Sequence, residues 1–557
     1  MLLGIDVGGT FTDAVIIADG KVFAQAKTAT VHENVLQGIL RALDMVLQGN
    51  DSQITRVVIS STIVTNALTE HQLDPVFLAV IAGPGMNVKN KFPVQPYEVS
   101  GYVDHRGKVT AQIDWSKHTD LLNTKGKGAA AVSGKFAVRD PKLELELAKC
   151  LRKNGYDPVF CASELNGELN FIRRTNSAYF AAATYKLFNE FAKDILQALT
   201  QRKINAPVYI LKADGGTLPL NEAMRQPVEA VFTGPAASVL GIEALVAPVL
   251  PAISLDVGGT TTDIAFWENG HPLMAKHGAV IDGFPTAVRT FHMRSIGIGG
   301  DSQVIKQSDG TYRVGPQRIG KAVAVGGKEV TLSDALITCG LVHFGDEQAA
   351  CEAVGKFGEA RVEAEKIVGN AVQQIMGTID SMLAEWAKQP VYTVEDVIKG
   401  TEFKPEVLVG VGGGAPGLIK ALGEKMRLPV DIPTGGMVAN AIGAALSRPT
   451  LSAALRADTT DGYYIIPESG RKEKLPSNFG RKKAEQVLKE YLQQKTAEWN
   501  LPDQDVELVA YEFFNTIHGY YDSGEIFNLR MQLKPGILHK LTVVDKELNI
   551  DGQEQTL

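Results

Sequence analysis

The sequence predicts an α/β protein in which two similar domains face each other. The first observation is a motif that the chain contains twice, GIDVGGTFTDAVI at residues 4–16 and ISLDVGGTTTDIAF at residues 253–266. A specific repeat with two distant copies indicates two related domains rather than a solenoid. Two predicted helices rich in small residues and a separate glycine-rich turn are the second and third observations.

Composition narrows the class of protein. The chain has 557 residues, of which 45% are apolar and 21% charged, enough for two to four domains. A net charge of −7 and a pI near 5.9 argue against nucleic acid or an anionic membrane as a partner. No membrane span is expected, because no run reaches about 18 apolar residues. The four cysteines form no C-x-x-C pair and a strand begins at the N-terminus, so we expect free thiols, a cytoplasmic location and no signal peptide.

Each copy of the repeat predicts a β-hairpin with glycines at its tip. Apolar residues lead up to a first aspartate, Asp6 or Asp256, and resume after a second, Asp13 or Asp263. Glycines allow positive φ and bring backbone N–H groups close to a ligand, and successive N–H groups at a turn bind anions. Threonines add hydroxyl donors. The predicted anion-binding residues are Gly8, Gly9, Thr10, Thr12, Gly258, Gly259, Thr260, Thr261 and Thr262.

The aspartates of the repeat indicate a metal ion beside this anion. The carboxylates of Asp6 and Asp256 would repel a phosphate directly. We therefore expect a hydrated Mg²⁺ between them and the phosphate oxygens, because Mg²⁺ keeps several waters and few protein ligands. Asp13 or Asp263 could orient a nucleophile or brace its hairpin, and bracing is the favoured interpretation. The alternative to a ligand-binding role is that the repeat forms two glycine-rich hairpins with aspartate at turn positions.

At these residues the chain resembles the actin, sugar-kinase and chaperone-ATPase superfamily, in which two domains each supply a phosphate-binding hairpin around ATP. The two motifs, DVGGTFTD near the N-terminus and DVGGTTTD later in the chain, resemble more narrowly those of the A subunits of the ATP-dependent hydantoinase/oxoprolinase family. The resemblance covers about 1–70 and 165–447 well. It implies an α/β fold of two actin-like (ribonuclease H-like) ATPase domains facing a nucleotide cleft, with an inserted α/β region and a small C-terminal extension.

The first domain is expected over residues 1–232, with the insertion at about 85–200. Apolar spacing predicts a helix from about Asn34 to Leu47. A strand near residue 60 is followed by the family's T-x-x-T-N-A-L stretch, and a later strand ends at A-D-G-G-T. Ligands bind at such strand ends in α/β sheets, although capping of a helix by Ser or Thr explains the first cluster equally well. The tentative substrate contacts here are Thr62, Thr65, Asn66 and Asp214.

The second domain is expected over residues 233–447, between two small-residue helices at 233–246 and 435–447. Small residues let helices approach closely, and the resemblance implies that this pair crosses between the domains as a hinge. The region 347–388 has a long helical pattern. Residues 448–557 are predicted to form an α+β extension, because a basic, polar helix there is followed by strands.

Two glycine runs of the second domain are further candidates for the nucleotide site. Ile296 to Ser302 read IGIGGDS where the family has I-G-A-G-G-G-S, so Gly299 and Gly300 match and Asp301 replaces a glycine. Asp301 is a tentative substrate contact that could position water or metal, or cap a helix. The segment VLVGVGGGAPGLIKALGEKM predicts a buried strand, a glycine run and a helix start, which suits adenine or ribose and a phosphate. The glycines of this run are Gly412, Gly413 and Gly414.

The resemblance implies a hydrolase subunit that uses ATP and Mg²⁺ to phosphorylate or activate the carbonyl of a cyclic amide or related small carbonyl compound. Asp6 and Asp256 would be catalytic and hold the metal, with Asp13 and Asp263 as further catalytic candidates. A B-type subunit is the expected partner, and a homo-oligomer is possible. Two alternatives stay open: a stand-alone small-molecule kinase, and an ATP-driven regulator or reactivator of a partner enzyme.

Overall fold

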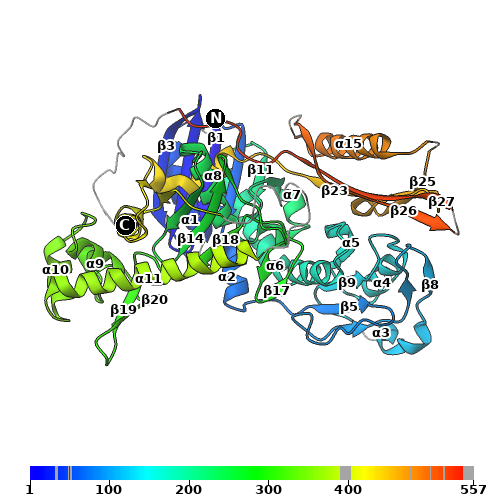
Figure 1. The fold of residues 1–557 in the computed structure, drawn as a ribbon, viewed down its shortest axis with the longest axis horizontal. Helices are drawn as coiled ribbons and strands as arrows, with labels where there is room; N and C mark the ends of the chain where they lie inside the picture. Colours follow the sequence, from blue (N-terminus) through cyan, green and yellow to red (C-terminus); the bar gives the residue numbers. More distant parts are fainter. Residues whose placement is uncertain are drawn as a thin grey trace.

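The computed structural model shows two α/β domains, an inserted α/β unit and a C-terminal extension (Figure 1). In Figure 1 the extension lies above the inserted unit, at the opposite end from helices α9 and α10. The described residues are 1–31, 35–47, 49, 53–123, 125–388, 403–476, 478–501, 504–518 and 521–542. The predicted start of a helix at Asn34 and the predicted end of the extension at 557 lie outside them.

The first domain is built on a six-stranded sheet of order β12-β11-β4-β1-β2-β3. The strands β1, β2 and β3 form an antiparallel meander, while β1, β4 and β11 run parallel. The helices of this domain are α1 (Val35–Leu47), α2 (Ile63–Thr69), α6 (Phe171–Gln201) and α7 (Leu220–Ala223). The strands are β1 (Leu2–Val7), β2 (Phe11–Ala18), β3 (Lys21–Ala29), β4 (Arg56–Ser61), β11 (Val208–Leu211) and β12 (Thr217–Pro219).

The second domain repeats this topology, with sheet order β15-β14-β13-β21-β22 and β18 paired to β14. Again an antiparallel pair, β13 and β14, adjoins a parallel neighbour, β21. The shared order confirms the prediction of two similar α/β domains. The strands are β13 (Ala252–Val257), β14 (Thr262–Glu268), β15 (His271–Pro272), β18 (Met293–Ile296), β21 (Val407–Val411) and β22 (Val430–Asp431), and the two-stranded ribbons are β16 (Val280–Ile281) with β17 (Phe284–Pro285) and β19 (Ser302–Lys306) with β20 (Tyr312–Arg318).

The helices of the second domain are α9 (Leu332–Thr338), α10 (Glu347–Gly355), α11 (Ala360–Ala387) and α13 (Ala415–Met426). Helix α13 packs on β13 and β21, α11 packs on α13 and β20, and α9 and α10 pack on α11. The helical pattern at 347–388 is therefore two helices, interrupted at Gly358, where φ is +155°. A glycine at such a φ ends a helix without steric cost, since it has no Cβ.

The inserted unit has a parallel sheet of order β10-β9-β5-β6. Its first strand, β5, begins at Phe77, before the start at about residue 85 that was expected from the sequence. The extension is an antiparallel five-stranded sheet of order β25-β24-β23-β27-β26, with α15 (Arg481–Glu498) packed on one face. The inserted elements are β5 (Phe77–Ile81), β6 (Tyr97–Glu98), β7 (Tyr102–Val103), β8 (Val109–Ala111), α3 (Thr119–Asn123), β9 (Ala130–Gly134), α4 (Lys142–Lys153), β10 (Val159–Cys161) and α5 (Ala162–Leu165), and the strands of the extension are β23 (Ser452–Asp458), β24 (Tyr463–Ile466), β25 (Arg471–Lys474), β26 (Val506–His518) and β27 (Tyr521–Leu533).

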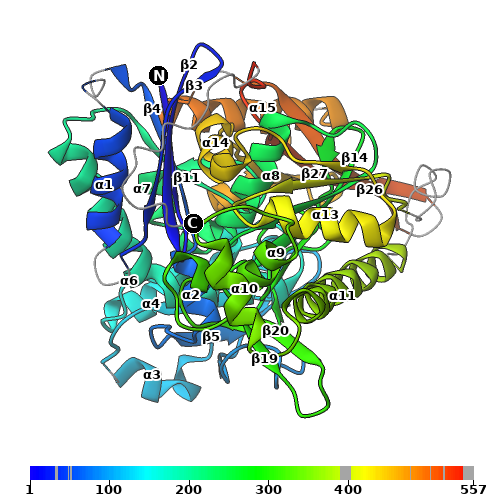
Figure 2. The same ribbon diagram turned by 90° about the vertical axis from the view of Figure 1, so that its left-hand side faces the viewer.

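Two helices lie between the sheets of the main domains, α8 (Thr233–Leu245) and α14 (Ala439–Leu446) (Figure 2). Their small residues form one hydrophobic cluster with side chains of both sheets, including Val15 of β2 and Trp267 of β14. A Cβ added at Gly241 would lie 2.1 Å from the Ala439 carbonyl oxygen. A Cβ at Gly443 would lie 1.9 Å from the Ala237 carbonyl oxygen. Glycine is therefore required at both crossings.

Among the described helices, none is long and apolar enough to span a bilayer.

We predict that Gly443→Ala lowers the free energy of unfolding by about 1–3 kcal/mol, because the added methyl group meets backbone that cannot move independently. Gly377→Ala is the matched control, because Gly377 is an exposed residue of α11 and an added Cβ would have no described atom within 4 Å apart from its chain neighbours and the nearby backbone of its own helix. The control should stabilise the protein by up to about 1 kcal/mol through helix propensity. Thermal unfolding of the two variants measures both effects. Equal unfolding temperatures would contradict the close packing of α8 on α14.

Candidate functional site

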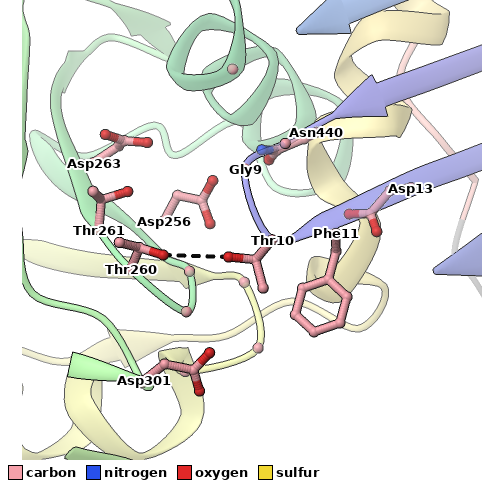
Figure 3. A pocket seen from close by; sticks show the side chains of 18 of the residues that line it. Gly9, Thr10, Phe11, Asp13, Asp256, Thr260, Thr261, Asp263, Asp301 and Asn440 are labelled. Carbon is pink, nitrogen blue, oxygen red and sulfur yellow. Dashed lines mark hydrogen bonds between the residues drawn. The ribbon is translucent and has the colours of Figure 1, made fainter. Parts of the chain in front are cut away.

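A cavity of about 450 Å³ lies between the two domains, where the tips of the repeated hairpins meet (Figure 3). The first tip follows β1 and the second follows β13, and both have the same register. Asp6 pairs with Asp13 across the first hairpin, and Asp256 pairs with Asp263 across the second. The cleft is therefore lined by two equivalent turns that approach from opposite sides.

Each turn is closed by the N–H of its first glycine. Gly8 donates to the Phe11 carbonyl over 3.0 Å, and Gly258 donates to the Thr261 carbonyl over 2.9 Å. The tips touch across the cleft, since the Oγ1 atoms of Thr10 and Thr260 are 3.3 Å apart (Figure 3). An anion between the two threonines would contact donors from both domains.

Of the carboxylates that follow and precede the tips, Asp6, Asp13 and Asp256 are buried and Asp263 is half-buried. Burial, with the charges of Asp13 and Asp256 nearby, raises the pKa of Asp6 to about 7. Burial, with the charge of Asp256, raises the pKa of Asp263 to about 7. Burial also raises the pKa values of Asp13 and Asp256. Such a group of carboxylates is stable as anions only with a cation nearby.

Two of these carboxylates have an oxygen available to a cation. Oδ1 of Asp6 and Oδ1 of Asp263 are buried and have no hydrogen-bond partner. Asn440 Nδ2 lies 3.4 Å from the other oxygen of Asp6. No cluster of three or more His, Cys, Asp or Glu side chains suited to a metal occurs among the described residues. This donor set fits Mg²⁺, which accepts few protein ligands and completes its shell with water and phosphate.

Asp13 is held by an ion pair within its own domain. Lys27 of β3 donates to both of its carboxylate oxygens, over 2.9 and 2.8 Å. The same ammonium donates to the Met437 carbonyl over 3.2 Å, which ties β3 to the segment preceding α14. This arrangement supports a bracing role for Asp13.

Part of the cavity lining is apolar and suits a flat ring. Leu336, Val342 and Phe344 contribute to it, and Leu336 and Val342 lie beside Gly417 of α13, just after the glycine run that follows β21. A Cβ at Gly412 would lie 2.5 Å from Asp256 Oδ1, and φ there is +89°. The glycines therefore keep backbone close to the aspartate and leave the space beside it open.

The structure brings most of the predicted site residues to this cavity. The predicted residues that line it are Asp6, Gly8, Gly9, Thr10, Asp13, Thr62, Asn66, Asp256, Gly258, Gly259, Thr260, Thr261, Asp263, Gly300, Asp301, Gly412, Gly413 and Gly414.

The remaining predicted residues, Thr12, Thr65, Asp214, Thr262 and Gly299, do not line the cavity. The threonine hydroxyls are used within the fold: Thr12 bonds Thr30, Thr65 accepts from the Phe232 N–H, and Thr262 donates to the Ile298 carbonyl. Asp214 is buried and pairs with Lys212 at 3.2 Å. Gly299 packs behind the second hairpin, since its Cβ would lie 2.6 Å from the Gly258 carbonyl oxygen.

Sequence reasoning missed several residues that line the cavity: Lys27, Glu70, Arg318 and Asn440. Asn440 had a detectable signal, because it is the one amide in the small-residue segment 435–447. Lys27 had none, since its role depends on the register of β3 against β2.

Comparisons with known proteins agree with this architecture. The model of the Hydantoinase/oxoprolinase family matches residues 174–452, and that of the Hydantoinase/oxoprolinase N-terminal region matches residues 2–155. An uncharacterized protein of Methanocaldococcus jannaschii is 23% identical in an alignment of length 500, and the match covers 80% of this chain and 72% of that protein. The acetophenone carboxylase gamma subunit of Aromatoleum aromaticum is 24% identical in an alignment of length 480, and the match covers 74% of this chain and 63% of that subunit.

A solved structure extends the likeness to the whole fold. The ATP-dependent caprolactamase from Pseudomonas jessenii superposes with a TM-score of 0.69 at 17% identity, covering 98% of this chain and 89% of the other. At that identity the superposition shows the fold alone. The two family matches lead to one assignment: this chain belongs to the hydantoinase/oxoprolinase family.

Proposed function

We propose that the chain binds ATP with Mg²⁺ in the cleft and uses it to phosphorylate or activate the carbonyl of a cyclic amide or related small carbonyl compound. The observation that carries the proposal is the contact of Thr10 with Thr260 above buried carboxylates of both domains. Two relatives support the class of substrate by their names, a caprolactamase described as ATP-dependent and an acetophenone carboxylase subunit.

The chain's part in phosphoryl transfer is to position groups and balance charge, which dominate this chemistry. The tip amides and the hydroxyls of Thr10 and Thr260 hold phosphate oxygens. Asp6, through its unpaired Oδ1, and Asp256 would hold a hydrated Mg²⁺, with Asp263 Oδ1 as a further candidate ligand. The metal would neutralise charge on the transferred phosphoryl group. The apolar part of the cavity lining receives the base. Closure of the domains about α8 and α14, the proposed hinge, excludes water.

The substrate is proposed to enter on the first-domain side, along α2. Thr62, Asn66 and Glu70 lie there on successive turns and line the cavity. Asn66 Nδ2 is 3.4 Å from Thr62 Oγ1 and lies near the first hairpin, 3.7 Å from the position of a Cβ on Gly9. An amide and a hydroxyl beside the phosphate site can bind a small carbonyl compound through its polar edge.

A B-type subunit is the proposed partner, because the relatives include a protein named as a gamma subunit. ADP release should be measured with hydantoins, lactams, 5-oxoproline and simple ketones, with and without the proposed B-type subunit. We expect at least one compound to stimulate ADP release and its product to require the subunit. A stable phosphorylated product without any partner would instead identify a kinase. Turnover that ignores every compound and responds only to a protein would identify a regulator.

Asp6→Ala and Asp256→Ala should each lower Mg²⁺-dependent ADP release by about 100-fold or more, because each removes a charge that holds the metal. The matched control is Asp380→Ala, which removes an exposed aspartate of α11 and should leave the rate unchanged. Steady-state ADP release measures all three. A normal rate in Asp6→Ala or Asp256→Ala would show that the metal lies elsewhere.

Asp6→Asn should stabilise the free protein at pH 8 and not near pH 4. The pKa of Asp6 is raised from 3.8 to about 7 in the folded chain, so unfolding releases its proton between these values. The free energy of unfolding therefore falls as pH rises through that window, by about 1.4 kcal/mol per pH unit. Asparagine removes this penalty, and we expect a gain of about 2–4 kcal/mol at pH 8. Thermal unfolding at both pH values measures the gain, and an equal effect at both would contradict the buried anion.

A further inference from the structure

The cavity has an excess of negative side chains for a site that should receive a polyphosphate. The acidic residues that line it are Asp6, Glu70, Asp13, Asp256, Asp263 and Asp301. Only two cationic side chains line it among the residues that the structure describes, Lys27 and Arg318. Mg²⁺ offsets part of a nucleotide's charge, so the remaining anionic oxygens need these two groups or water.

Lys27 has no donor left for a ligand. An ammonium has three N–H groups, and those of Lys27 go to the two oxygens of Asp13 and to the Met437 carbonyl. Its charge is also matched by Asp13 at 2.8 Å. Lys27 therefore braces the first domain and contributes little to binding a phosphate.

Arg318 has donors to spare. A guanidinium has five N–H groups in a fixed fork. The Nε of Arg318 donates to Asp301 Oδ2 over 3.0 Å, and the Nη2 atom lies 2.9 Å from the same oxygen. The side chain of Arg318 is 32% exposed and that of Asp301 is 9% exposed. The rest of the fork is therefore available to a ligand in the cavity.

Asp301 holds this guanidinium beside the second hairpin. The N–H of Asp301 donates to the Gly259 carbonyl over 2.7 Å, and the preceding Gly300 donates to the Gly258 carbonyl over 2.9 Å. The carboxylate lies 3.0 Å from the position of a Cβ on Gly259. Figure 3 shows Asp301 on the same side of the cleft as Thr260. An unpaired carboxylate at Asp301 would repel a phosphate. Its ion pair with Arg318 instead places N–H donors beside the second hairpin.

We propose that Arg318 binds the polyphosphate of the nucleotide from the second domain, and that Asp301 is the residue that positions its guanidinium. The inference rests on the proposed binding of ATP and adds a cationic contact to it. It also assigns Asp301 to phosphate positioning instead of the substrate contact expected from the sequence.

A simpler role for Arg318 would be to neutralise Asp301 without touching the ligand. Both roles predict weaker ATP binding in Arg318→Ala, because that variant leaves Asp301 uncompensated. They differ in the double variant Asp301→Asn/Arg318→Ala, where no charge remains to neutralise. If Arg318 contacts phosphate, the double variant still binds ATP more weakly than Asp301→Asn alone. If it only neutralises Asp301, these two variants bind equally.

The test is titration calorimetry of the full chain with Mg·ATP and with adenosine, which has no phosphate. We expect Arg318→Ala to weaken Mg·ATP binding about 10- to 100-fold, as for loss of a charge-assisted contact, and to leave adenosine within about twofold. The double variant should remain about 10-fold or more weaker than Asp301→Asn. Arg294→Ala is the control, because the Arg294 side chain is 37% exposed, close to the 32% of Arg318, pairs with Glu385 at 2.6 Å and does not line the cavity.

Three results would overturn the inference while ATP still binds the unaltered chain. They are equal affinities of the double variant and Asp301→Asn, an unchanged affinity in Arg318→Ala, and an equal loss for adenosine and Mg·ATP. If the unaltered chain binds no ATP, the proposed function fails and this contact fails with it. Arg318→Ala leaves the buried carboxylate of Asp301 without its partner and should lower the unfolding temperature, and the double variant with Asp301→Asn should restore it, because no unpaired charge remains.

Discussion

The close contact of α8 with α14 is the constraint on which the cleft depends. Backbone of each helix fills the space that a side chain on the other would need, at Gly241 and Gly443. A third glycine extends the contact to the first sheet, since a Cβ at Gly4 would lie 2.1 Å from the Ala441 carbonyl oxygen. Because both sheets pack on this pair of helices, the ends of β1 and β13 are brought opposite each other. Hydrogen-bond contact between the hairpin tips follows from that packing.

The carboxylates in the cleft destabilise the free protein when they are ionised, and a bound cation would offset this repulsion. Asp6 and Asp263 each bury an oxygen without a partner, and burial raises the pKa of both. A chain selected for stability alone would not keep these groups together in a poorly solvated space. The first domain neutralises one carboxylate, Asp13, with its own lysine, and the second neutralises Asp301 with Arg318. The carboxylates left without such a partner face the proposed metal.

The features that could be predicted from the sequence are those that depend on residues close together in the chain. The hairpins follow from an aspartate, two glycines and resumed apolar residues, and the glycine run at Gly412–Gly414 follows a buried strand as expected. Side chains that depend on register could not be predicted this way. Thr12 and Thr262 belong to the repeat, yet their hydroxyls bond Thr30 and Ile298 because of the strands beside them. Lys27 and Arg318 reach the cavity because of how β3 pairs with β2 and β20 pairs with β19.

The two hairpin tips are proposed to form one site for a nucleotide polyphosphate. A crystal structure with Mg²⁺ and a non-hydrolysable ATP analogue would show whether they do. We expect the polyphosphate between Thr10 and Thr260, with the hydrogen bond that now joins their hydroxyls replaced by bonds to phosphate oxygens. An analogue bound elsewhere, with Thr10 and Thr260 still in contact, would contradict the account.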